Sequence, residues 1–137
     1  MKIKRGTLYK ILISVAVFWI IDFVLHYTGV GETNFYYASK LGNAVLFAII
    51  WFGILNYSQH WKKLVYAVIF GTYISFYYLI ASYSGLVQFF FSIYARYTPP
   101  PFVIFGLYLT PVIWWFVHAL AFYLGLELAD KLIKQTK

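Results

Sequence analysis

Asp22 and His26 are the residues whose types and spacing most directly suggest chemistry. They stand four residues apart in the segment WIIDFVLHYTGVGE, which begins at Trp19. At that spacing both side chains project from one face of a helix. A carboxylate in a membrane-spanning helix costs about 2.5–3.5 kcal/mol at mid-bilayer on insertion scales. Asp22 therefore needs a partner, a proton or a water-filled cavity, and His26 can hydrogen-bond to it and share its proton.

Four further polar residues are expected on the same side of the membrane as Asp22 and His26. They are Glu32, Lys40, Asn43 and Arg96. We expect the six groups to converge near the extracytoplasmic side, with Asp22 in a partly buried ion pair with Lys40 or Arg96. Such a pair either fixes helix packing or forms a site that binds a ligand or exchanges a proton. The residue types leave both interpretations open.

His118 is a separate, secondary candidate, expected in the inner half of the fourth span. It lies among aromatic residues such as Trp114 and Phe122. A single histidine on an apolar face is more often a packed, neutral residue than a ligand. Its expected partners, at a similar depth, are Asn56 and Tyr73.

Catalytic and metal-binding chemistries have weaker support. A metal site needs at least three ligands, and Asp22, His26 and Glu32 form the only local set. No serine lies in a G-x-S-x-G motif, and the chain contains no cysteine. We therefore expect no metal and no cofactor, and we favour a protein that is not an enzyme.

The composition is typical of an all-α integral membrane protein. Of the 137 residues, 63% are hydrophobic and 11% are charged, whereas soluble domains carry about 25% charged residues. The net charge of +7 comes from cations at the ends of apolar segments rather than on a continuous basic face. Nucleic acid is therefore not an expected partner.

Four apolar segments are long enough to be transmembrane helices of one domain over residues 1–137. About 20 residues at 1.5 Å each cross a hydrocarbon core of roughly 30 Å. The first segment follows basic residues, as in a signal peptide, but no cleavage motif follows and we expect it to be retained. The expected spans of this four-helix bundle are about 8–27, 37–57, 64–83 and 102–126.

Three local features qualify these spans. Pro111 is expected to kink the fourth span. The apolar segment 85–97 is too short to cross the membrane, so we expect an interfacial or re-entrant helical segment between the third and fourth helices. A polar tail follows the fourth span, and its acids are expected to pair within the helix. These pairs are Glu127 with Lys131 and Asp130 with Lys134.

Two stripes of small residues are expected to bring helices together. In the second span, Ala38 and Gly42 form a small-xxx-small pair that permits close approach. In the third span, Ala67, Gly71 and Ser75 form a similar stripe. We expect both stripes to face neighbouring helices.

The distribution of basic residues orients the spans. Nine of the 11 Lys and Arg residues lie at the N-terminus, after the second span or in the tail. Lys40 and Arg96 fall on the other side. By the positive-inside rule, both termini are cytoplasmic, and a prokaryotic chain of this kind would lie in the inner membrane.

We expect this protein to bind or transport a small hydrophobic or cationic molecule. Aromatic residues make up 24% of the chain. Rings beside a polar cluster suit an amphiphile, although ordinary lipid-facing rings explain the same fraction. An accessory or assembly subunit of a larger membrane complex is the alternative, and a lipid-modifying enzyme using Asp22 and His26 is the third. Expected partners are membrane lipids and either a homo-oligomer or a larger complex.

Overall fold

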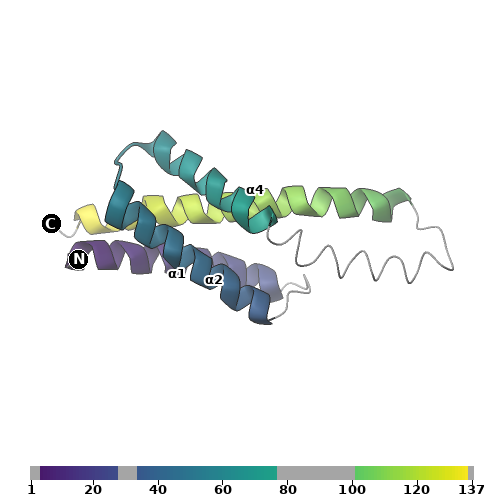
Figure 1. The fold of residues 1–137 in the computed structure, drawn as a ribbon, viewed down its shortest axis with the longest axis horizontal. Helices are drawn as coiled ribbons and strands as arrows, with labels where there is room; N and C mark the ends of the chain where they lie inside the picture. Colours follow the sequence, from purple (N-terminus) through teal and green to yellow (C-terminus); the bar gives the residue numbers. More distant parts are fainter. Residues whose placement is uncertain (1–3, 28–33, 77–100, 136–137) are drawn as a thin grey trace.

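The computed structural model describes residues 4–27, 34–76 and 101–135, and these residues form helices and no strand. The helices are α1 (Arg5–Tyr27), α2 (Asn34–Ile50) with a π-helical turn η1 (Trp51–Leu55), a helix over residues 60–76, and α4 (Pro101–Gln135). Successive helices run in opposite directions (Figure 1). The start of α1, the connection over residues 56–59 and the end of α4 lie at one end of the bundle, here named the termini end.

Three of these helices are long and apolar enough to cross a membrane, over Arg5–Val24, Tyr37–Leu55 and Val112–Lys134. Large apolar side chains such as Leu12, Ile69 and Phe116 are exposed on outward faces, as in proteins whose surface contacts lipid. The third expected span, 64–83, is helical as far as residue 76 and lies beyond the described residues after that. The expected interfacial segment 85–97 also lies outside the described residues.

α4 is longer than the sequence patterns predicted. The fourth span was expected to end near Leu126, but the helix passes through Pro111 and continues to Gln135. Its 35 residues correspond to about 52 Å. The last turns stay helical because they still pack against the bundle, where Ala129 and Asp130 are buried.

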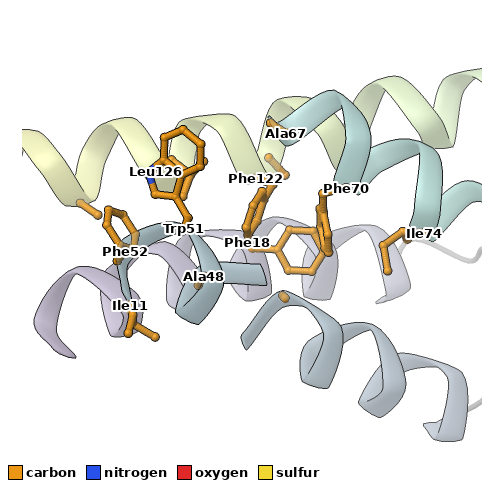
Figure 2. Packing of buried hydrophobic residues seen from close by; sticks show 13 residues of the cluster. Ile11, Phe18, Ala48, Trp51, Phe52, Ala67, Phe70, Ile74, Phe122 and Leu126 are labelled. Atoms are coloured by element: carbon orange, nitrogen blue, oxygen red, sulfur yellow. The ribbon is translucent and has the colours of Figure 1, made fainter. Parts of the chain in front are cut away.

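Three phenylalanines from three helices form the centre of the core (Figure 2). The ring centroids of Phe70 and Phe122 are 4.3 Å apart, and Phe18 lies 5.3 Å from Phe70 and 6.1 Å from Phe122. Phe18 meets both partners edge to face, an arrangement that aromatic quadrupoles favour. This apolar layer separates the two ends of the bundle interior.

α1 and α4 meet along contacts that recur about every four residues, as expected for one face of each helix. Starting from the termini end, the pairs are Lys10 with Asp130, Ser14 with Gly125, Phe18 with Phe122 and Asp22 with His118. The second pair is close because Gly125 has no side chain: a Cβ there would lie 2.7 Å from the Ser14 carbonyl oxygen. Charged pairs therefore stand at both ends of an apolar seam.

The predicted stripe on the third span is buried. Ala67, Gly71 and Ser75 all face the interior. A Cβ at Gly71 would lie 2.8 Å from the Ala119 Cβ. The helix over residues 60–76 therefore approaches α4 most closely where it lacks a side chain.

The predicted stripe on the second span is wrong. Ala38 and Gly42 are exposed, and a Cβ at Gly42 would meet nothing within 4 Å. The buried face of α2 instead follows Lys40, Ala44 and Ala48. Lys40 must turn inward to reach its carboxylate partner, and residues four and eight positions later turn inward with it.

Candidate functional site

Asp22 of α1, Lys40 of α2 and His118 of α4 meet in the bundle interior and are here named the buried triad. The Lys40 Nζ donates to Asp22 Oδ1 over 2.7 Å. The His118 Nε2 lies 3.1 Å from Asp22 Oδ1 and 3.2 Å from Lys40 Nζ. Asp22, Lys40 and His118 are only 3%, 0% and 1% exposed. Each of the three polar atoms is thus within hydrogen-bond distance of the other two.

The hydrogen bond between His118 and Trp114 assigns the histidine tautomer. The His118 Nδ1 lies 2.7 Å from the Trp114 carbonyl oxygen. A carbonyl oxygen only accepts, so Nδ1 carries a hydrogen. In the neutral ring Nε2 is then an acceptor, and the Lys40 ammonium donates to it. A protonated ring would instead donate from Nε2 to Asp22 and repel Lys40.

Aromatic rings close one side of the buried triad. The Lys40 Nζ lies 5.4 Å from the Trp114 ring centroid, within the range of a cation–π contact. Trp114 stacks on His118 with ring centroids 5.2 Å apart and an interplanar angle of 28°. The triad therefore surrounds one cation with a carboxylate, an imidazole and an indole face, where low polarity strengthens charge interactions.

The predicted pairing of Asp22 with Lys40 is present. Asn43 is not part of this group, because its Oδ1 accepts a hydrogen bond from the Tyr73 hydroxyl over 3.4 Å. Glu32 and Arg96 lie outside the described residues, as does the side chain of His26. The structure therefore brings together two of the six predicted residues and adds His118.

The predicted partners of His118, Asn56 and Tyr73, are wrong. Asn56 is an exposed residue that ends η1. The error came from placing the end of the fourth span at Leu126, which put His118 too near the termini end. The sequence does contain a signal for the correct depth. Lys10 and Asp22 are as far apart in the sequence as His118 and Asp130. Two antiparallel helices that place Lys10 beside Asp130 therefore also place Asp22 beside His118.

A second charged cluster lies at the termini end and is here named the terminal clamp. Asp130 accepts from Lys10 over 2.6 Å and from Lys63 over 2.5 Å. Glu127 lies 3.3 Å from Lys63 Nζ and 2.6 Å from His60 Nδ1. The clamp ties together α1, the helix over residues 60–76 and α4.

The expected pairs within α4 are therefore wrong. Glu127 and Asp130 face the bundle, whereas Lys131 and Lys134 are exposed. Lysines from other helices pair with these carboxylates, because α4 continues past Leu126 and stays packed against the bundle. Lys63 is 2% exposed, and two acids around it offset its desolvation.

No protein-family model, curated protein or solved structure matches this chain. Among the described residues, no group of three His, Cys, Asp or Glu side chains is placed to hold a metal ion. The function is therefore inferred from the chemistry of the buried triad itself.

Proposed function

We propose that this chain is a four-span membrane protein that binds or transports a small hydrophobic or cationic molecule at the buried triad. The observation that supports this most is the burial of Asp22, Lys40 and His118 within apolar helices. Replacing a buried ion pair with well-packed apolar residues is often neutral or stabilising. Ionisable groups kept inside membrane helices usually belong to ligand or proton pathways.

Charge balance suggests how the buried triad responds to a cation or a proton. Among the described groups, and with His118 neutral, the charge of Lys40 cancels that of Asp22. A proton on His118, or a second cation at Asp22, leaves a net positive charge in an apolar site, which is costly. The helix over residues 60–76 adds no charge to the buried triad, because its charged residues lie in or near the terminal clamp, as Lys63 does. Protons and cationic ligands therefore compete for Asp22, and cation binding weakens as the pH falls.

Equilibrium binding of 2-phenylethylammonium to the detergent-solubilised protein tests this proposal. This probe combines an aromatic ring with a cation. The wild type and Asp130→Asn should bind it, and Asp22→Asn should not. Asp130 is the matched control, because it is also a buried aspartate paired with lysine but belongs to the terminal clamp. Equal binding by Asp22→Asn and the wild type would refute the proposal.

An accessory subunit of a larger membrane complex is the second candidate. It is supported by the exposed face of α2 around Ala38 and Gly42, where no side chain of the described chain approaches Gly42. Small residues four apart favour close helix contacts in membranes. A photo-reactive group on a cysteine at Gly42 should then cross-link another protein in native membranes. The same group on Leu12→Cys, on an exposed face of α1, is the control.

A further inference from the structure

We propose that Lys40 occupies the binding position of a primary ammonium ligand, so that the buried triad binds small organic amines by displacing the Lys40 side chain. This inference rests on the proposed function and names its ligand class. It also assigns Lys40 a role as a built-in competitor that holds the site when no ligand is present.

The contacts of the Lys40 ammonium define the ligand. Its nitrogen lies 2.7 Å from Asp22 Oδ1 and 3.2 Å from His118 Nε2. The Trp114 ring centroid is 5.4 Å away. A primary ammonium has N–H groups to donate to both acceptors while its charge faces the indole. A quaternary ammonium has no N–H group and would leave both acceptors without a donor.

The Lys40 ammonium already occupies the position between the Asp22 carboxylate and the Trp114 ring. Lys40 is fully buried, and its side chain fills the space between Asp22 and Trp114. Two ammonium groups that both contact the Asp22 carboxylate would repel each other strongly in a region of low polarity. Ligand binding therefore requires that the Lys40 ammonium leave.

The position of Lys40 in α2 provides a route for it to leave. α2 begins at Asn34, so Lys40 lies about 9 Å from the start of the helix. A lysine stem is long and flexible enough to carry its charge toward the membrane interface. Displacement therefore leaves Asp22 paired with the ligand and returns the lysine charge toward water.

Chemical rescue of Lys40→Ala tests the nature of the site. This variant keeps only Cβ of the lysine side chain, and the missing Cγ, Cδ, Cε and Nζ correspond to the atoms of n-propylammonium. Propylammonium should raise the Tm of Lys40→Ala by several degrees and that of the wild type much less, because the wild type must first release the Lys40 ammonium. Propan-1-ol, tetramethylammonium and sodium at equal concentration should have little effect. The double variant Lys40→Ala/Asp22→Asn should not respond to propylammonium, because the carboxylate is absent.

Competition tests the role of Lys40. Removing a built-in competitor raises apparent affinity, so Lys40→Ala should bind 2-phenylethylammonium about tenfold tighter than the wild type or more. Equal affinities would overturn the claim that Lys40 must be displaced. A Tm response to propan-1-ol or tetramethylammonium as large as that to propylammonium would overturn the assignment of a primary amine.

Lys40→Cys keeps the test decisive if Lys40→Ala does not fold. Ethylammonium is the matching probe, because the cysteine restores one more atom of the side chain. Failure of both variants to fold even when purified with their amines would also overturn the inference, since a free amine should fill the site. Rescue is measured on the Lys40 variants and depends on no binding to the wild type. A failure of the proposed function is therefore distinguishable from a failure of this inference.

Discussion

Two buried lysines, Lys40 and Lys63, occupy opposite ends of the apolar core and differ in their surroundings. Lys40 pairs with the carboxylate of Asp22 and borders an imidazole and an indole. Lys63 lies between the two carboxylates of Glu127 and Asp130. The terminal clamp therefore joins two carboxylates to lysines from two other helices, whereas the described part of the buried triad has the carboxylate of Asp22 beside Lys40 and His118.

Removing the charge of Lys63 should destabilise the fold. Lys63→Met leaves Glu127 and part of the charge of Asp130 without a buried partner, a loss of about 3–5 kcal/mol when buried pairs are broken. Lys62→Met is the matched control. The Lys62 ammonium lies 3.9 Å from the Tyr57 ring centroid, a contact worth about 0.5–1 kcal/mol at exposed sites. Thermal unfolding in detergent measures both variants, and equal Tm values would contradict the structural role of the clamp.

Residue pairing was only partly predictable from the sequence. An acid in a span requires a cation, and Lys40 was one of two cations expected on the same side of the membrane as Asp22, so the sequence predicted this pair as one of two alternatives. The partners of His118, Glu127 and Asp130 were missed because they depend on how deep each helix lies relative to the next. Hydropathy places a helix end only to within a turn or two, and in α4 the error exceeded two turns.

At the scale of helices, close packing depends on which glycines face a neighbour. Gly71→Ala places a Cβ 2.8 Å from the Ala119 Cβ, whereas Gly42→Ala adds one that meets nothing within 4 Å. Both changes gain about 1 kcal/mol of helix propensity. Only Gly71→Ala must push the helix over residues 60–76 away from α4, at a cost of about 1–3 kcal/mol. Gly71→Ala should therefore unfold at a lower temperature than Gly42→Ala, and the reverse order would show that the helices do not meet at Gly71.

The helices themselves were largely predictable, and their faces less so. Long apolar segments identified the first, second and fourth helices, because lipid requires about 20 apolar residues to span it. The face of α2 was mispredicted because small residues were taken to mark the interface. The burial of Lys40, driven by a carboxylate on another helix, fixed the rotation of α2 instead. Such a long-range electrostatic constraint is invisible to local periodicity.

For the whole molecule, we predict four spans with both termini cytoplasmic. The start of α1 and the end of α4 lie at the termini end of the bundle (Figure 1), and most Lys and Arg residues belong to segments expected on that side. Single cysteines can be introduced cleanly because the chain has none. An impermeant thiol reagent applied to intact cells should label cysteines placed at Glu32 and Thr98 but not one placed at Lys62. The opposite pattern would invert the topology and put the buried triad near the cytoplasmic side.

The central claim is that Asp22 belongs to a binding site and is not only a packing residue. The direct test measures thermal stability and 2-phenylethylammonium affinity together, at two pH values, for the wild type and Asp22→Asn. We expect wild-type affinity to fall at the lower pH. We expect Asp22→Asn to keep a near-native Tm, because the flexible Lys40 stem can carry its ammonium toward the membrane interface once the carboxylate is gone, and to lose both the binding and its pH dependence. A large drop in Tm, with unchanged affinity in the fraction that remains folded, would contradict the account and leave Asp22 as a structural partner of Lys40.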